Sequence, residues 1–150
     1  MDKSQQLKIK QQILDSCILP ALIYGAQTWT TTQQQRTALQ VTQRKMERKI
    51  LNISIRDRIK NTEVRRRTQV KDAATAAQVT KWRWAGHVVR LNTNRWTKIA
   101  TVWDPREGER GRGTPRMRWA DELKRNAGNI WTRIARNRDA WKAHEQVYRN

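Results

Sequence analysis

The sequence predicts an all-α protein, a helical bundle of about six to eight short-to-medium helices with a basic Gly/Arg loop. Apolar residues recur every three or four positions through most of the chain, which is the period of an amphipathic helix. No stretch alternates apolar and polar residues for long enough to build a sheet. Glycine, proline and capping residues separate the periodic segments, at places where helices commonly begin and end.

Three helices are expected in the first part of the chain. The first covers Ser4–Ser16, and Pro20 should interrupt or restart it, because proline fits a first helical turn. A second short helix is expected from about Leu19 to Thr28. Thr31 and Thr32 can cap the third. The apolar stripe of this third helix contains Leu39, Met46, Ile50 and Ile53, and the basic residues away from that stripe are Arg44, Lys45, Arg48 and Lys49.

A long helix is expected at the centre of the fold. After a loop at 52–61 and a brief helix through Val64 and Arg67, Asp72 can cap a helix that runs to about Leu91. This helix is apolar on two faces and should therefore be packed on both sides. One face contains Ala73, Ala77, Trp84, Val88 and Leu91, the other contains Trp82 and Val89, and Arg83 and Arg90 lie between the two.

A short helix at 94–102 should precede the clearest loop, at 104–114, where three Gly and three Arg make the chain too polar and too flexible to pack. This loop divides the chain into helical segments at 1–103 and 115–150. Thr114 can cap the first helix of the second segment, and Gly128 and Asn129 can end it. Two more helices are expected at 130–136 and 139–148. The expected packing residues are Trp119, Ala120, Leu123, Ala127, Trp131, Ile134, Trp141 and Tyr148.

The eight tryptophans have two alternative roles in a chain that contains no phenylalanine. Trp84, Trp119, Trp131 and Trp141 lie on apolar helical stripes, which favours packing in the core. Trp82, Trp96 and Trp103 are left open between core packing and stacking on nucleic-acid bases.

The charge of the chain indicates a polyanionic partner. Lys and Arg number 32 against 13 Asp and Glu, a formal charge of +19, and such self-repulsion is relieved when an anion binds. RNA, RNA–DNA hybrid or DNA fits better than a membrane, because arginine predominates and the charge is spread along the whole chain. No small-molecule substrate is indicated.

An intracellular location, nuclear or cytoplasmic, is expected. Cys17 is the only cysteine, so neither a disulfide framework nor a cysteine-rich zinc site can form. The apolar run from Cys17 to Ala26 is about half as long as a membrane span requires. The N-terminus shows no signal-peptide pattern.

Basic clusters occur in every segment and are not balanced by acidic residues. A charge run is usually a solvated surface, but this lack of balance favours contact with phosphates. Such contacts would position a nucleic-acid backbone and would not read its sequence. The residues assigned to this interface are Arg65, Arg66, Arg67, Lys81, Arg83, Arg90, Arg106, Arg110, Arg112, Arg116 and Arg118, and a further basic cluster is Arg133, Arg136 and Arg138.

No enzyme active site, metal site or cofactor site is expected. Two-metal chemistry needs converging carboxylates, and the one adjacent acidic pair, Asp121 and Glu122, lies beside basic residues on an expected helix. His87 and His144 have no nucleophile motif near them, so a hydrolytic triad is not supported.

Several stretches resemble one family. Residues 18–29, ILPALIYGAQTW, resemble the segment that follows the polymerase core in the reverse transcriptases of non-LTR retrotransposons. Further stretches match the C-terminal tail of RTE-like elements in the same order, and together they cover nearly the whole chain. They are residues 50–61, 66–68 (RRT), 81–87 (KWRWAGH), 94–96 (NRW), 113–119 (GTPRMRW) and 137–141 (NRDAW).

The resemblance implies that the chain is the thumb and tail of an endonuclease and RNA-directed DNA polymerase, without either catalytic centre. Residues 1–103 would then be thumb-like, and the tail would help to grip RNA or a template–primer. Gln27 stands where the family commonly has Glu, and no Cys-His knuckle is present. Three alternatives remain: a helical interaction module that docks on the polymerase core or self-associates, an enzyme with an unrecognised site, and a relic without present function.

Overall fold

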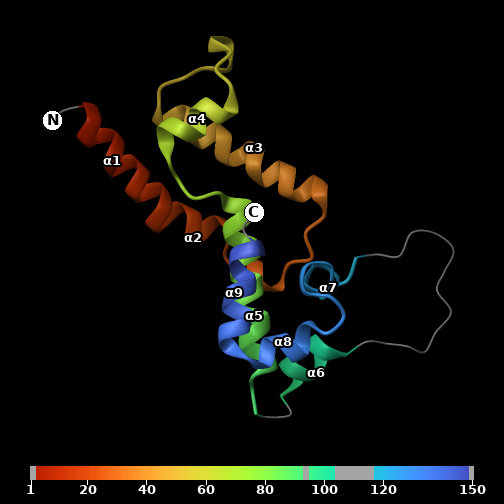
Figure 1. Ribbon diagram of the computed structural model, residues 1–150. Coiled ribbons are helices and arrows are strands. Elements are labelled where there is room, and N and C mark those ends of the chain that lie inside the picture. The colour runs from red at the N-terminus through yellow and green to blue at the C-terminus, as the bar shows by residue number, and fades with distance from the viewer. Residues whose placement is uncertain (1–2, 93–94, 104–116, 149–150) are drawn as a thin grey trace, which may run out of the picture. The chain divides into compact units, whose positions relative to one another are not determined.

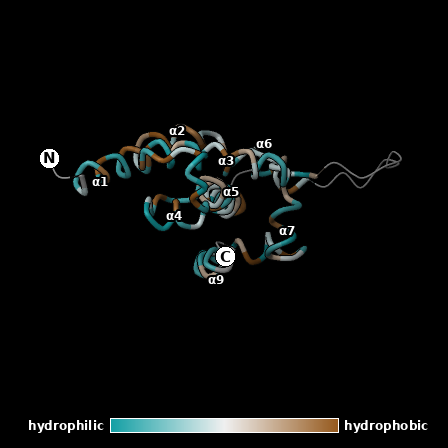
Figure 2. Tube along the Cα trace, turned by 90° about the horizontal axis from the view of Figure 1, so that it is seen from above, coloured by the Kyte–Doolittle hydropathy of each residue, from teal (hydrophilic) through white to brown (hydrophobic). Residues whose placement is uncertain are grey.

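The computed structural model of the protein (Figure 1) describes residues 3–92, 95–103 and 117–148, and these residues form helices and connecting turns without any strand. The all-α prediction is thereby confirmed. Hydrophobic and hydrophilic residues are interspersed along the helices (Figure 2), as the amphipathic periods indicated. Among the described residues, no helix is both long enough and apolar enough to cross a membrane.

The chain forms two compact units. Unit 1 consists of Met1–Gly25 and Thr31–Ala77, and unit 2 consists of Ala26–Thr30 and Gln78–Asn150. The division therefore falls within helix α5 (Ala73–Val89), whose first residues belong to unit 1 and whose remainder belongs to unit 2. The sequence placed its boundary in the Gly/Arg loop at 104–114, and that loop lies outside the described residues.

Unit 1 begins with a nearly continuous helical segment. Helix α1 (Lys3–Ile13) passes through a π-helical turn (Leu14–Ile18) into α2 (Leu19–Leu22), which has Pro20 in its first turn. Pro20 thus lies where the helix restarts, as expected, because a proline in a first turn removes no hydrogen bond that the new helix needs. The expected helix to Thr28 stops at Leu22, and Ala26–Thr28 is a single 3-10 turn.

Helix α3 (Gln33–Ile50) begins with the predicted cap. The Thr32 hydroxyl accepts a hydrogen bond from the Gln35 backbone N–H at 3.2 Å, and the Gln35 side chain accepts one from the Thr32 N–H at 2.9 Å. The expected apolar stripe is only half-buried, and the fully buried side chains of α3 are instead polar ones, Gln43 and Glu47. The hydrophobic period therefore located the helix but did not identify its buried face.

Gln43 is buried because it serves as a hydrogen-bonding bridge. Its amide nitrogen donates to the Lys71 carbonyl at 2.6 Å, and its amide oxygen accepts from the Ala73 N–H at 2.7 Å. These two backbone groups lie in the link between α4 (Asn61–Thr68) and α5. Asp72 caps α5 as predicted, since its carboxylate accepts the Thr75 N–H at 3.0 Å. The buried amide thus satisfies backbone groups that would otherwise be costly to bury.

In unit 2 the remainder of α5 packs with α7 (Asp121–Ala127), α8 (Trp131–Arg136) and α9 (Arg138–Tyr148), and α6 (Trp96–Val102) also belongs to this unit. Helix α7 begins later than expected, and the predicted cap Thr114 lies outside the described residues. Gly128 ends α7 with a φ of +74°, a conformation that favours glycine.

The core of unit 2 is built on tryptophan. Its buried members are Trp82, Ala85, Val89, Leu123, Ala127, Trp131, Ala135 and Trp141. The rings of Trp82 and Trp141 stack with centroids 3.8 Å apart and planes 2° from parallel. Each indole N–H also donates to the other residue's carbonyl oxygen, at 3.1 and 2.9 Å. This pair fixes α9 against α5.

The tryptophan assignments need one correction. Trp131 and Trp141 are buried as predicted, and Trp82, which was left open, is buried too. Trp84 was assigned to the core but is 36% exposed, because the core contacts α5 on the face that contains Trp82 and Ala85. Trp119 is half-buried against the core. The side chain of Tyr148 lies outside the described residues.

Candidate nucleic-acid interface

The predicted arginines of α4 are all engaged with carboxylates in unit 1. Arg65 lies 3.3 Å from Asp72 and 3.7 Å from Glu47. Arg66 and Arg67 both bind Glu63, at 2.7 and 2.6 Å. Hydrogen bonds from these two guanidinium groups lower the pKa of Glu63 to about 2. Much of the positive charge of α4 is therefore balanced within the helix and its surroundings.

The predicted basic residues of α5 also have structural partners. Lys81 is only 2% exposed, and its ammonium group contacts Glu122 at 3.0 Å and the Trp29 carbonyl at 3.1 Å. Arg83 forms a bidentate pair with Glu145, at 2.9 and 2.8 Å. A buried ammonium is not available to a phosphate, so Lys81 has to be removed from the candidate interface.

Arg90 forms a hydrogen bond with the backbone in the last turn of α8. Its guanidinium donates to the Ala135 carbonyl at 2.7 Å. Burial lowers the pKa of Arg90, and the positive charge of Arg138 lowers it further. Of the remaining predicted residues, Arg118 is exposed. Arg106, Arg110, Arg112 and Arg116 lie outside the described residues.

The largest excess of exposed positive charge on the described helices lies on α8 and α9. We call Arg133, Arg136, Arg138 and Lys142 the α8–α9 basic cluster. All four side chains are exposed, and within the described residues none of them forms an ion pair with Asp or Glu. Asp139 is the single acidic residue at 131–142. Among the described residues, no carboxylate competes with an external anion for these four side chains.

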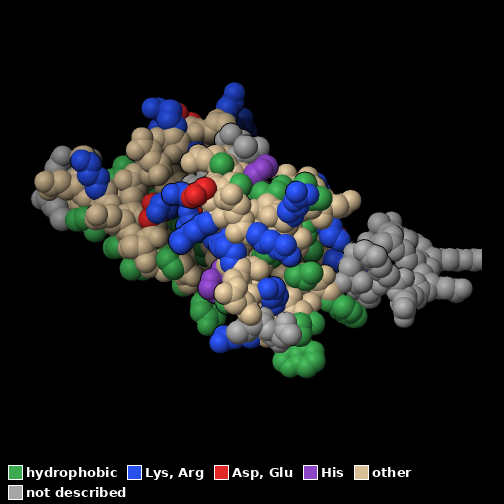
Figure 3. Space-filling view, turned by 60° about the horizontal axis from the view of Figure 1, so that its bottom comes forward, with side chains coloured by type: hydrophobic (Ala, Val, Ile, Leu, Met, Phe, Trp, Pro, Cys, Tyr) green, Lys and Arg blue, Asp and Glu red, His purple; other side chains and the backbone are tan. Residues whose placement is uncertain are grey.

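The whole of unit 2 shares this imbalance. Its sequence contains 17 Lys and Arg but only 7 Asp and Glu. Figure 3 shows a face on which Lys and Arg side chains are prominent, few Asp and Glu are visible, and hydrophobic side chains are exposed nearby. Lys142 was missing from the sequence-based assignment, although the run of basic residues after Trp131 was a signal that could have included it.

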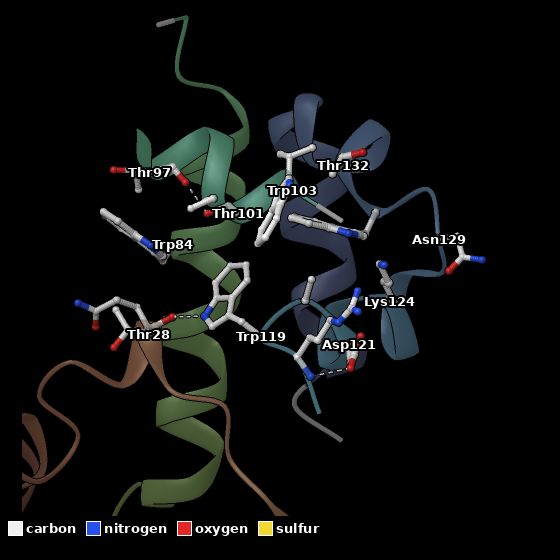
Figure 4. A pocket seen from close by; sticks show the side chains of 16 residues that line it. Thr28, Trp84, Thr97, Thr101, Trp103, Trp119, Asp121, Lys124, Asn129 and Thr132 are labelled. Atoms are coloured by element: carbon white, nitrogen blue, oxygen red, sulfur yellow. Dashed lines mark hydrogen bonds between the residues drawn. The ribbon is translucent and has the colours of Figure 1, made fainter. Parts of the chain in front are cut away.

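A cleft of about 780 Å³ lies within unit 2. We call it the tryptophan cleft, because Trp84, Trp103, Trp119 and Trp131 line it. Figure 4 shows the rings of Trp84, Trp103 and Trp119 around the same hollow, with Asp121 and Lys124 at one side. Polar side chains from α6, α8 and the 3-10 turn complete the lining, among them Thr28, Thr97, Thr101 and Thr132.

The aromatic wall of this cleft is held in place by the core. The Trp119 indole N–H donates to the Gln27 carbonyl at 2.7 Å, and the Trp119 ring meets the Trp131 ring edge-on with centroids 6.5 Å apart. The Lys81 ammonium lies 5.2 Å from the Trp119 ring centroid, within reach of a cation–π attraction. Trp119 is therefore a fixed surface.

The structure brings together most of the stretches that carry the family resemblance. Lys81 and Trp119 bind carbonyls of the turn that contains Gln27 and Trp29, and Trp82 stacks on Trp141. Four separate stretches thus meet in unit 2. Trp82 and Trp141 belong to the core of this unit, whereas Trp84 and Trp119 line the cleft.

The acidic and histidine side chains in the described part of the chain form no cluster of metal ligands. No group of three or more His, Cys, Asp and Glu side chains lies close enough together to hold a metal ion there. Glu122 binds Lys81, and the Asp121 carboxylate accepts the Arg118 backbone N–H at 2.7 Å, so the adjacent acidic pair has structural partners.

Comparisons with known proteins give one relationship. No protein-family model matches the chain, and no solved structure matches it. A Caenorhabditis elegans protein, described as an uncharacterized transposon-derived protein, is 32% identical over 120 residues. The match covers 77% of this chain and 43% of that protein, so the chain spans less than half the length of its relative. The chain is thus related to a transposon-derived protein.

Proposed function

We propose that this chain is the nucleic-acid-binding C-terminal part of the RNA-directed DNA polymerase of a non-LTR, RTE-like retrotransposon. It grips RNA, RNA–DNA hybrid or template–primer DNA through phosphates and takes no part in bond making or breaking. The relationship to a transposon-derived protein supports this proposal, as do the ordered stretches that resemble reverse transcriptase tails. In a complete element the polymerase and endonuclease centres would lie in other parts of the protein.

The α8–α9 basic cluster is the observation that carries the proposal. Within the described residues its four cationic side chains are exposed and have no ion-pair partners. Cations placed in this way release condensed counterions from a nucleic acid when they meet its phosphates, which makes binding strong and dependent on salt. Arginine also binds phosphate through two parallel hydrogen bonds.

Salt-titrated fluorescence anisotropy tests whether the chain binds nucleic acid through phosphates, a mode of binding that we call the phosphate grip. With about 6–8 phosphate contacts, the slope of log affinity against log salt on duplex DNA should be about −5 to −7. Replacing Arg133, Arg136 and Arg138 by Gln should weaken binding to all sequences alike and flatten that slope by about 2 to 3. A wild-type slope shallower than about −2 would exclude the grip.

A matched control removes the same charge elsewhere. Lys8, Lys10 and Lys45 are exposed in unit 1, and their triple replacement by Gln also lowers the charge by three. This control should leave the slope close to the wild-type value. Equal flattening in both triple variants would show that net charge alone governs binding and that the α8–α9 cluster has no special role.

A second candidate function is docking on another protein surface, such as the polymerase core or a second copy. Exposed apolar side chains on the N-terminal helical segment and after it favour this candidate: Ile9, Ile13, Ile18 and Tyr24. A folded chain that binds nucleic acid weakly and without salt dependence would support docking. Sedimentation of the wild type beside Ile9→Glu/Ile13→Glu would then show whether this surface mediates self-association.

A further inference from the structure

We propose that the tryptophan cleft takes an unpaired base of a single-stranded segment, with the adjoining phosphate close to Lys124 and Arg118. This inference rests on the proposed function and assigns a second site, separate from the α8–α9 basic cluster. The cluster would hold the backbone of any nucleic acid. The cleft would distinguish nucleic acids that offer an unpaired nucleotide from those that do not.

The first observation that supports the base site is the solvent-exposed aromatic surface in the cleft. Trp103 is 70% exposed and Trp84 is 36% exposed, yet both line the same hollow as the fixed ring of Trp119 (Figure 4). Large apolar surface gathered in a concave, polar-rimmed place is typical of a binding site. Because Trp119 and Trp131 are held by the core, the cleft can accept a flat ring without first reorganising.

The second support is the chemistry of the lining. Lys124 and Arg118 bring positive charge to the rim, and the carboxylate of Asp121 already accepts the Arg118 backbone N–H. The hydroxyls of Thr97 and Thr132 can donate to or accept from the polar edges of a base. The Thr101 hydroxyl donates to the Thr97 carbonyl at 2.7 Å and can still accept. A peptide side chain would need only the apolar surface, whereas a nucleotide uses aromatic, hydroxyl and cationic groups together.

An unpaired base fits better than a duplex. In a duplex both faces of each base are covered by its neighbours, so indole rings have no free face on which to stack. A base in a loop, a bulge or an unpaired end offers its face and its hydrogen-bonding edge at once. The cleft should therefore favour ends and loops over continuous helix.

The test uses the full chain and two RNA hairpins in which a non-nucleotide linker replaces the loop, so that neither offers unpaired loop bases. One has a blunt end and the other has a short unpaired 3′ extension that contains 2-aminopurine. The wild type should bind the extended hairpin about tenfold more tightly, since stacking adds affinity for each base. The fluorescence of the analogue should be quenched on binding. Trp84→Ala/Trp103→Ala should lose the preference and the quenching, while its affinity for the blunt hairpin stays unchanged.

Two controls keep the test specific. Trp96→Ala removes a tryptophan that is 83% exposed at the start of α6 and does not line the cleft, so it should behave as wild type. Trp84→Phe/Trp103→Phe retains aromatic faces and should recover most of the preference. Circular dichroism of every variant shows whether its helices are intact.

Each outcome decides between the two proposals. Salt-dependent binding of both hairpins without preference overturns the base site and leaves the phosphate grip in place. A preference for the extended hairpin with a shallow salt slope supports the base site and overturns the grip. Absence of binding to either hairpin overturns both. Equal losses in Trp96→Ala and Trp84→Ala/Trp103→Ala would show that any exposed tryptophan contributes, which also overturns the base site.

Discussion

Trp82 and Trp141 form a reciprocal pair in which the rings stack 3.8 Å apart and each indole N–H donates to the carbonyl of the other residue. The pair joins positions 59 residues apart, and Arg83–Glu145 is a second contact between α5 and α9. The hydrogen bond from Arg90 to the Ala135 carbonyl joins the end of α5 to α8. Figure 1 shows α9 running alongside α5. Unit 2, which contains the candidate interface, therefore depends on this contact.

Removal of one tryptophan ring of this pair should strongly destabilise the protein. Trp141→Ala should lower the free energy of unfolding by about 3–5 kcal/mol, because it removes a large buried ring and leaves a cavity. Trp141→Phe should cost less, since it keeps most of the packing and loses only the hydrogen bond from the indole N–H to the Trp82 carbonyl. Urea denaturation followed by circular dichroism measures both. Trp96→Ala, as an exposed control, should change the stability by less than about 0.5 kcal/mol.

Gly86→Ala should destabilise the protein although alanine is the better helix former. A Cβ at position 86 would lie 2.5 Å from two atoms of the Trp141 ring and 2.9 Å from the Arg90 guanidinium. Overpacking of this kind costs about 1–3 kcal/mol, against about 1 kcal/mol gained in helix propensity. In a thermodynamic cycle, Gly86→Ala should cost much less in a Trp141→Ala background. Gly128→Ala, where nothing lies within 4 Å, should instead be additive with Trp141→Ala.

The buried ion pair between Lys81 and Glu122 should be sensitive to the loss of one partner. Lys81→Met leaves the Glu122 carboxylate buried without its ammonium and should cost about 3–5 kcal/mol. Lys81→Met/Glu122→Leu should recover a substantial part of this loss, because neither charge then remains. Arg83→Met is the control, since the Arg83 side chain is mostly exposed although its partner Glu145 is buried, and its loss should therefore cost less than the loss of Lys81. If Arg83→Met proved as harmful as Lys81→Met, burial would not explain the difference between the pairs.

Glu63 should give a defined response to acid. Hydrogen bonds from Arg66 and Arg67 lower its pKa from the ordinary value of 4.5 to about 2. A folded pKa below the unfolded one means that the stabilisation is complete above about 4.5 and is lost as the pH falls toward 2. The stability difference between wild type and Glu63→Gln should therefore shrink over that range. In an NMR titration, Arg66→Gln/Arg67→Gln should return the Glu63 pKa to near 4.5, and an unchanged pKa would contradict the assignment.

The sequence predicted the helices better than it predicted their surroundings. Thr32, Asp72 and Gly128 act at helix ends as expected, because caps and stops depend on a few neighbouring residues. Pro20 lies in the first turn of a restarted helix as expected, after a π-helical turn, but that helix ends at Leu22 instead of Thr28. The loop at 104–114, the predicted cap Thr114 and the four arginines at positions 106, 110, 112 and 116 lie outside the described residues and remain predictions.

The candidate site was predicted only in outline. An excess of positive charge and a supply of tryptophan are properties of composition, and both pointed toward nucleic acid. The individual assignments depended on partners that are far away in the chain. Lys81 is neutralised by Glu122, 41 residues away, and Trp84 faces the cleft because the core lies on the Trp82 side of α5.

The sequence by itself determined that this protein is helical, strongly basic and rich in tryptophan, because helix period, capping and charge are local or additive properties. Only the tertiary structure decided that Gln43 and Glu47 are buried on α3, that Trp82 lies inside while Trp84 lines a cleft, and which cations have carboxylate partners. The physical reason is that periodicity fixes the angle of a side chain around its own helix. What that side chain meets depends on segments that approach from elsewhere in the chain.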